Sequence, residues 1–283
     1  MTEIEYIGKC LLVEIDEGKK ILIVGDLHLG YEEALNKTGV FMSRKMFDEM
    51  INEFDQIFHR IKEISEREKK LSDRTSGLEV NKNVKVNDEG GDVEDNKNSL
   101  VDEIVLLGDV KHVFGTVLEQ EWRDVLKLID YFGKKLKKNG KIIITKGNHD
   151  VTLGPILKGK EGVKLVDNYI VDGLCFIHGD KDYEEIWTDK IKLIIIGHVH
   201  PAVRIRDRDG IKEEKYKCFL SGKYKERNWI IVPSFAEYSE GMDVRDVDGI
   251  EILRKIDLMK FNVIVVDPMG LETRDFGKLE KLE

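Results

Sequence analysis

Five short apolar runs, each followed by glycine and polar side chains, constrain the fold of this chain more than any other feature. The runs are 21–24, 104–107, 142–144, 174–177 and 193–196, and the sequences that follow them are GDLH (25–28), GDVKH (108–112), GNHD (147–150), HGD (178–180) and GHVH (197–200). Continuous apolar runs bounded by glycine are typical of strands buried on both faces. Ligand sites in open α/β sheets lie beyond the carboxyl ends of such strands. The sequence therefore predicts an α/β fold with a polar site at the strand ends.

Two amphipathic stripes alternate with these runs and predict helices that cover the sheet. Apolar residues recur at helical spacing between positions 47 and 61, which predicts a helix over about 43–69. A second stripe covers 118–136 and is closed by Asn139 and Gly140, a typical helix stop.

The rest of the chain is expected to complete a single domain over residues 1–283. Apolar runs after Pro201 predict a second, mostly antiparallel sheet; they are 229–232, 250–253 and 263–266. Residues 72–99 contain no aromatic side chain, five asparagines and many charges. Such a segment buries too little apolar surface to offset its ordering entropy, so it is expected to be a flexible charged insertion.

Composition places the chain among globular proteins and argues against a membrane protein. It has 283 residues, of which 41 % are hydrophobic and 36 % charged, and no apolar run approaches the roughly 20 residues of a membrane span. The opening MTEIEYIGKC lacks the basic and apolar regions of a secretory signal, so the cytoplasm is the expected location. Cys10, Cys175 and Cys218 form no CxxC pair and are expected to be core residues rather than disulfide or zinc ligands.

A net charge of −9 excludes a broadly basic nucleic-acid coat, although a local patch could still contact phosphates. Residues 204–227 contain nine Lys or Arg against five acids, with Tyr216, Phe219 and Tyr224 interleaved. This segment is either a surface that steers a phosphate backbone and stacks a base or a solvated strand pair with alternating charges.

Histidines are concentrated in the loops that follow the apolar runs. Six of the seven lie there, and they are His28, His112, His149, His178, His198 and His200. Asp26, Asp109 and Asn148 share these loops. Imidazole, carboxylate and amide oxygen without thiolate suit divalent Mn, Fe, Co, Ni or Zn.

The donors are too numerous for one tetrahedral ion. In an extended stretch, residues i and i+2 point the same way, so Asp26 with His28, and His198 with His200, can each bring two ligands to one place. A carboxylate such as Asp109 can bridge through both oxygens. Two ions about 3.5–4 Å apart clamp the attacking and leaving oxygens of an in-line phosphoryl displacement.

The ordered set D-x-H, GD, GNHD, H and GHxH resembles the calcineurin-like metallophosphoesterases. The resemblance implies a four-layer α-β-β-α sandwich, in which two packed β-sheets are flanked by helices. It also implies two divalent ions, with manganese the first choice and iron, nickel, cobalt or zinc as alternatives. The implied ligands are Asp26, His28, Asp109 and His200 for one ion, and Asp109, Asn148, His178 and His198 for the other.

The resemblance gives three further residues a role toward the substrate. His149 would stabilise the scissile phosphate or protonate the leaving group, without binding a metal. Asp150 would orient His149, or else cap a helix. His112 completes a GDxxH motif that resembles the SbcD branch of DNA-repair nucleases, where this histidine contacts the phosphodiester. The opening segment GDLHLGYE resembles the SbcD-related archaeal phosphoesterases more closely still, a group that implies no substrate.

The leading hypothesis is a dinuclear metal-dependent phosphoesterase that hydrolyses phosphodiester bonds by in-line attack of a metal-bound hydroxide. A role as a DNA-processing nuclease belongs to this leading hypothesis. A small-molecule phosphodiesterase or a phosphomonoesterase is the alternative, and a non-catalytic scaffold of the same fold is a distant third. SbcD-type nucleases carry a substantial C-terminal capping domain, whereas residues 201–283 are needed here for the second sheet. The sequence contains no GxxxxGK[ST] motif, so an ATP-driven motor would be a separate partner subunit of a DNA-repair assembly. The oligomeric state stays open.

Overall fold

The computed structural model describes residues 2–75, 100–206, 209, 211–247 and 250–282. Most of the expected insertion, residues 76–99, lies outside the described residues. The prediction that the insertion begins at residue 72 is wrong, because residues 72–75 form the last turn of a long helix. Helical hydrogen bonding continues there past the last apolar position of the stripe.

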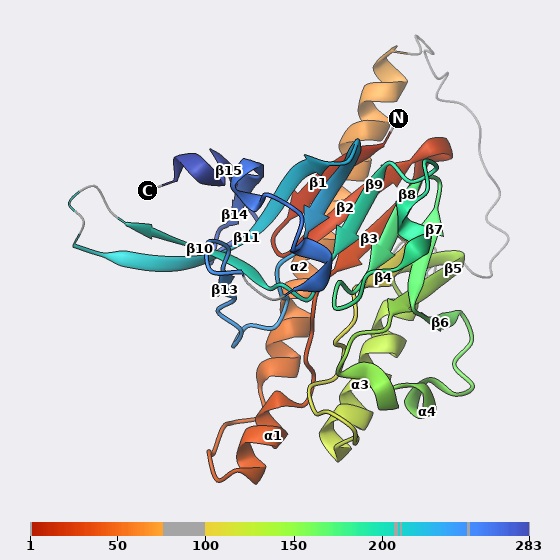
Figure 1. The fold of residues 1–283 in the computed structure, drawn as a ribbon. Helices are drawn as coiled ribbons and strands as arrows, with labels where there is room; N and C mark the ends of the chain where they lie inside the picture. Colours follow the sequence, from red (N-terminus) through yellow and green to blue (C-terminus); the bar gives the residue numbers. More distant parts are fainter. Residues whose placement is uncertain (1, 76–99, 207–208, 210, 248–249, 283) are drawn as a thin grey trace, which may run out of the picture.

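The first sheet has six strands in chain order, so each strand lies beside its predecessor, and helices connect β3 to β4 and β4 to β5 (Figure 1). The strands are β1 (Glu3–Ile7), β2 (Cys10–Ile15), β3 (Lys19–Val24), β4 (Val101–Leu106), β5 (Leu136–Thr145) and β6 (Val163–Val166). The first three pair antiparallel, and β3 to β6 pair parallel. Parallel pairing directs the carboxyl ends of β3, β4 and β5 to one edge.

The second sheet has nine strands and faces the first (Figure 1). The strands are β7 (Asn168–Val171), β8 (Leu174–Ile177), β9 (Leu193–Ile196), β10 (Pro201–Arg206), β11 (Glu213–Tyr224), β12 (Arg227–Ile231), β13 (Met242–Asp243), β14 (Asn262–Val266) and β15 (Thr273–Lys278). It begins at β7, well before the expected start at Pro201. The central β8, β9 and β12 pair parallel, so the sheet is mixed. Residues 251–253, expected to be a strand, form a 3-10 turn instead.

The described residues form four α-helices, of which α2, α3 and α4 share a core with the first sheet, whereas α1 lies beyond the ends of the strands (Figure 1). They are α1 (Tyr31–Lys37), α2 (Met46–Thr75), α3 (Glu119–Gly133) and α4 (Gly154–Leu157). The second predicted helix is too long at its carboxyl end, because residues 136–140 open β5. There the backbone pairs with β4 through Leu136 and Val101, and Asn139 adopts a φ of 65°. Strand pairing at this point overrides the helical periodicity.

Alternate side chains of the buried strands fill different cores, as expected for strands buried on both faces. Ile21 and Ile23 of β3 pack in the core between the two sheets, whereas Leu22 and Val24 pack in the core between the first sheet and helices α2 and α3. The outer face of the second sheet is covered by 3-10 turns that bury residues such as Ile186. The expected two-sheet sandwich is confirmed, with 3-10 turns in place of α-helices on this outer face.

Two further expectations can be compared with the described residues. Cys10, Cys175 and Cys218 are free and buried, as expected. Among the helices that the structure describes, none is long and apolar enough to cross a membrane.

Candidate metal centre

The first group of donors lies where β3 and β9 end. One ligand atom from each of Asp26, His28 and His200 lies within 4.8 Å of the others. Asp26 is fully buried, and its Oδ1 is 3.1 Å from Nε2 of His200. Nδ1 of His28 and Nε2 of His200 are buried without a hydrogen-bond partner among the described residues. Buried polar atoms are normally paired, so the unpartnered Nε2 of His200, which faces the Asp26 carboxylate, fits a cation at this point.

The second group lies where β5, β8 and β9 end. Nε2 of His178 is 3.1 Å from Oδ1 of Asn148, 3.0 Å from Nδ1 of His198 and 3.4 Å from Oδ2 of Asp109. Nδ1 of His178 donates to the Leu107 carbonyl at 2.6 Å, so Nε2 of the neutral ring carries a lone pair. Four groups that can each supply a lone pair face one another here, and this donor set fits a divalent metal.

Asp109 stands between the two groups. Its Oδ2 lies 3.4 Å from Nε2 of His178 in the second group and 3.9 Å from Nε2 of His28 in the first. Its Oδ1 accepts a hydrogen bond from the backbone N–H of His149 at 2.9 Å. The seven residues that were expected to bind metal are therefore brought together, with Asp109 in the position of a bridge.

Burial and charge set the protonation of the centre. Burial opposes ionisation of Asp26, but His200, His178 and His28 outweigh it and hold the pKa of this carboxyl well below its usual range. Burial lowers the pKa of His28 to about 3, so its ring is neutral at physiological pH. Burial lowers the pKa of His178, but the neighbouring carboxylates of Asp109 and Asp26 outweigh it and raise this pKa to about 9. Without metal, a proton on His178 would supply the positive charge that the carboxylates demand.

The backbone of the centre is strained. His28, Asp109, His198 and His200 all have φ between 46° and 63°, a left-handed region that non-glycine residues rarely occupy. Such strain gathers where surrounding structure holds a functional geometry. The adjoining glycines permit close approach, because a Cβ on Gly147 would overlap Oδ1 of Asp109.

His112 and His149 lie beside the first group. One ligand atom of each lies within 4.8 Å of one from His28. Nδ1 of His149 contacts the carbonyl of His112, and the Phe114 ring lies 3.6 Å from the His149 ring. Burial, together with His149, lowers the pKa of His112. Two imidazoles thus border the metal centre without belonging to either group that contains a carboxylate.

Asp150 does not hold the ring of His149, contrary to the expectation. Its Oδ1 accepts from the backbone N–H of Val110 at 3.0 Å, and its Oδ2 from that of Gly147 at 3.1 Å. Nor does its side chain cap a helix, because Asp150 is the first residue of a 3-10 turn whose N-cap is His149. The buried carboxylate joins the loops after β4 and β5. The sequence left both alternatives open because backbone donors carry no sequence signal.

The segment 233–241 after β12 supplies contacts that sequence reasoning missed. Ser234 donates from Oγ to the Asp26 carbonyl at 3.0 Å, and Ser239 Oγ lies 3.1 Å from Nδ1 of His200. Tyr238 Oη lies 3.4 Å from Nδ1 of His112. β12 is parallel to β9, so its carboxyl end lies at the same edge. The polar run SFAEYS after the apolar run 229–232 was the available signal.

Ser239→Ala is expected to weaken metal binding. The hydroxyl accepts from Nδ1–H of His200 and thereby turns Nε2 toward Asp26. Loss of such an outer partner typically lowers metal affinity about 10–100-fold, so competition of the purified protein with a chelator for Mn²⁺ should show a loss of that size. Ser65→Ala removes a hydroxyl of α2 that contacts Lys20 of β3, far from the metal centre, and serves as the control. Equal affinities of the two variants would contradict this role.

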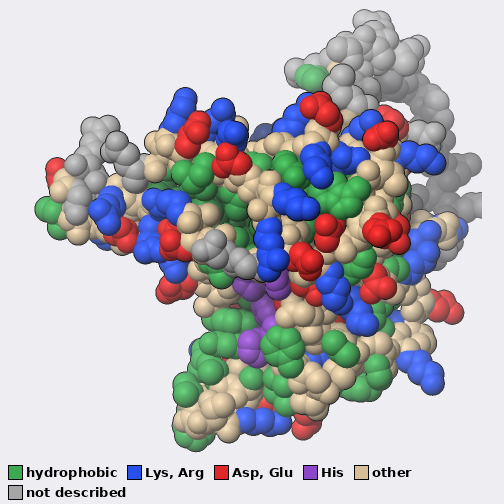
Figure 2. Space-filling model, in the orientation of Figure 1, with side chains coloured by type: hydrophobic (Ala, Val, Ile, Leu, Met, Phe, Trp, Pro, Cys, Tyr) green, Lys and Arg blue, Asp and Glu red, His purple; other side chains and the backbone are tan. Residues whose placement is uncertain are grey.

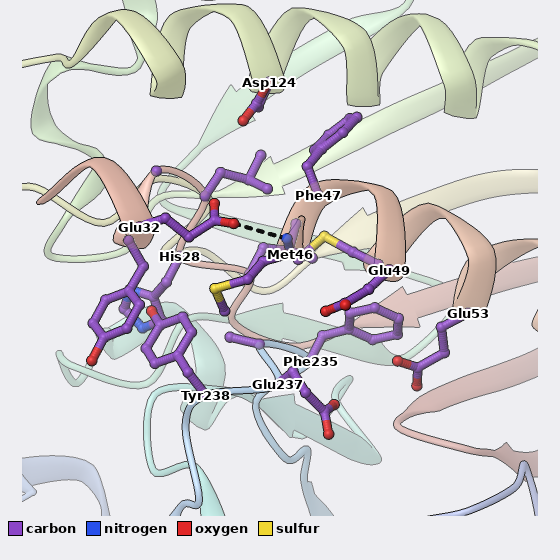
Figure 3. Close-up of a pocket in the computed structure, with 16 residues that line it drawn as sticks. His28, Glu32, Met46, Phe47, Glu49, Glu53, Asp124, Phe235, Glu237 and Tyr238 are labelled. Carbon is purple, nitrogen blue, oxygen red and sulfur yellow. Dashed lines mark hydrogen bonds between the residues drawn. The ribbon is translucent and has the colours of Figure 1, made fainter. Parts of the chain in front are cut away.

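A small cavity of about 310 Å³ adjoins the metal centre (Figure 3). It lies beside His28 and Tyr238 and is bordered by helices α1 and α2. Glu32 of α1 accepts from the backbone N–H of Met46 of α2 at 2.8 Å, the dashed contact in Figure 3. This contact holds the two helices together at the rim.

The basic segment 204–227 forms most of the β10–β11 hairpin, which projects from the body as an arm (Figure 1). Basic and acidic side chains mingle along this arm, and the histidines gather in a hollow below it (Figure 2). The ion pairs of the hairpin include Arg204–Asp243, Arg206–Glu213, Lys212–Glu214 and Lys215–Glu240, and farther along β11, where it pairs with β12, Lys223 pairs with Glu226. Phe219 is fully buried between the sheets and cannot stack a base. These contacts agree with the second alternative for this segment, a solvated strand pair with alternating charges.

The fold and this donor set define the class of the protein as a metal-dependent phosphoesterase. Residues 19–266 match the calcineurin-like phosphoesterase family, and the chain belongs to that family. Among solved structures, a nuclease MPE from Pseudomonas putida is 14 % identical, with a TM-score of 0.48 over 94 % of this chain and 97 % of that chain. None of the curated proteins matches the chain.

Proposed function

We propose that this protein is a dinuclear phosphodiesterase. The observation that carries the proposal is the placement of Asp109, whose Oδ2 lies 3.4 Å from Nε2 of His178 in one donor group and 3.9 Å from Nε2 of His28 in the other. Asp26, His28, Asp109 and His200 would hold one ion, and Asp109, Asn148, His178 and His198 the other. Manganese is the first choice, because nitrogen and oxygen donors without thiolate suit it, with iron, nickel, cobalt and zinc as alternatives.

The bound ions would lower the pKa of water and neutralise the charge of the phosphate. The side chains then have distinct tasks. His149, fixed at Nδ1 by the His112 carbonyl, directs Nε2 toward the centre, 3.8 Å from Asp109. With a proton on both ring nitrogens, it can protonate the leaving oxygen from Nε2 or stabilise the phosphate. His112 would contact a phosphate oxygen.

A diester is favoured over a monoester because His112 adds a second imidazole at the phosphate. Its spacing from Asp109 is similar to that of the SbcD branch. Two imidazoles beside the metal centre can act as hydrogen-bond donors to the single negative charge of a diester phosphate. The scaffold alternative is disfavoured because the full donor set is retained and converges.

A small diester is favoured over a nucleic acid. The pairing of the basic residues on the β10–β11 hairpin with carboxylates leaves this arm a poor track for a polyanion, since protein–DNA affinity rests on neutralised phosphates. Cleavage of DNA, alone or with a partner subunit of a repair assembly, is the alternative. Binding of labelled DNA that falls steeply with salt would favour that alternative.

The proposal is tested with metal-stripped protein refilled with Mn²⁺. We expect hydrolysis of bis-p-nitrophenyl phosphate to require the metal and to exceed that of p-nitrophenyl phosphate. His112→Ala should impair diester cleavage more than monoester cleavage. A preference for the monoester would overturn the diester assignment, and inactivity with Mn, Fe, Ni, Co and Zn toward both substrates would favour the scaffold.

A further inference from the structure

The Nδ1 atoms of His112 and His149 face partners of different kinds. Nδ1 of His149 faces a carbonyl, which can only accept. Nδ1 of His112 faces the hydroxyl of Tyr238 at 3.4 Å, which can also donate. Two neighbouring imidazoles can therefore hold their protons on different nitrogens.

Two tyrosines fix the plane of the His112 ring. Tyr238 stacks on Tyr31 with 3.4 Å between centroids and 1° between planes. The edges of this stack face His112, with interplanar angles of 89° for Tyr31 and 90° for Tyr238. Tyr31 is the first residue of α1, whereas Tyr238 lies on the segment after β12. The stacked pair of tyrosines therefore connects segments from both halves of the chain. Figure 3 shows Tyr238 beside His28 at the end of the cavity.

The segment that carries Tyr238 is itself anchored. Lys217 of β11 donates to the carbonyls of Ser234 at 2.9 Å and Ala236 at 2.5 Å. Glu237 forms an ion pair with the buried Lys9 at 2.9 Å. These contacts, at residues 234, 236 and 237 just before Tyr238, limit the movement of the Tyr238 hydroxyl relative to the centre.

The chemistry decides which partner donates. If Nδ1 of His112 donated to Tyr238, the lone pair of Nε2 would face an anionic phosphate, which is unfavourable. If Tyr238 donates, Nε2 carries the proton and becomes a hydrogen-bond donor. Burial raises the pKa of Tyr238 far above its usual range, so the phenol keeps its proton.

We propose that Tyr238 is a positioning residue, which donates to Nδ1 of His112 and thereby holds Nε2–H toward the substrate phosphate. Tyr31 keeps the Tyr238 ring in place. The inference rests on the proposed phosphodiesterase function, because the phosphate that would face Nε2 decides the direction of the hydrogen bond between Tyr238 and His112. The tautomer of His112 is measured on the protein without substrate, so the positioning role and the hydrolytic activity are tested separately.

The first test is the tautomer, read from ¹H–¹⁵N correlation spectra of histidine-labelled, Zn²⁺-loaded protein. We expect His112, assigned by the signal lost in His112→Gln, to be in the Nε2–H form. Tyr238→Phe keeps the stacked ring but removes the donor, so the population should shift toward Nδ1–H. Tyr31→Phe, the matched control, should leave the spectrum unchanged. An Nδ1–H form in the wild type, or no change in Tyr238→Phe, would overturn the inference.

The second test is kinetic. In Tyr238→Phe, KM for bis-p-nitrophenyl phosphate should rise about fivefold, the size of one hydrogen bond, with kcat changed much less. In a His112→Gln background, the same substitution should have no further effect, because the two side chains act as a pair. Additive effects would overturn the coupling. Failure of the protein to cleave diesters would refute the proposed function and leave the tautomer measurement to decide the positioning role.

Discussion

Asp109→Asn is expected to abolish both metal binding and hydrolysis. The substitution preserves shape but removes the charge that both donor groups share, since Oδ2 lies 3.4 Å from His178 and 3.9 Å from His28. Loss of the shared carboxylate should release at least one ion per chain. Turnover of bis-p-nitrophenyl phosphate should fall by a factor on the order of 10³ or more, corresponding to several kcal/mol of lost transition-state stabilisation.

Elemental analysis and turnover should be measured on the same preparation. Asp55→Asn is the matched control, because this carboxylate pairs with Lys135 on the surface. It should retain metal and rate. Thermal unfolding of both variants, with and without Mn²⁺, separates misfolding from loss of the site, since an ion that binds the native state raises stability by mass action. Two ions and wild-type turnover in Asp109→Asn would refute the bridging role.

His149→Ala should keep the metal and lose turnover by roughly 10²–10⁴-fold, the range for a positioned general acid. Its side chain contacts the His112 carbonyl and the Phe114 ring and lies outside both carboxylate-containing groups. His59→Ala is the control, because His59 is a surface residue with its side chain 75 % exposed. A full rate in His149→Ala would show that the ring takes no part in hydrolysis.

The choice of substrate separates the two roles left open for His149. If it protonates the leaving oxygen, the loss should be much larger for a diester with an alkoxide leaving group than for one that releases p-nitrophenolate. Phosphate stabilisation would instead lower both rates by similar factors. The two assays therefore assign the role from one variant.

Most of the fold was accessible from local patterns. The five buried runs and the helix over 43–69 correspond to β3, β4, β5, β8, β9 and α2, because burial on one or both faces leaves a periodic trace. Two predictions of secondary structure were wrong because contacts between distant segments decided the outcome. Residues 136–140, expected to end a helix, belong to β5, where Leu136 pairs with Val101 of β4. Residues 251–253, expected to form a strand, form a 3-10 turn that packs into the core on the outer face of the second sheet. Neither contact is visible in a local window.

The candidate site divides along the same line. The sequence by itself determined the donor types and their places after the strands, because glycine and strand ends dictate where such side chains can converge. Only the tertiary structure decided that Asp109 faces both donor groups, that Asp150 ties backbone loops together and that Ser239 and Tyr238 hold the outer nitrogens of His200 and His112. Those contacts join segments far apart in the chain through hydrogen bonds and ring packing, which depend on how two sheets meet and not on the spacing of residues.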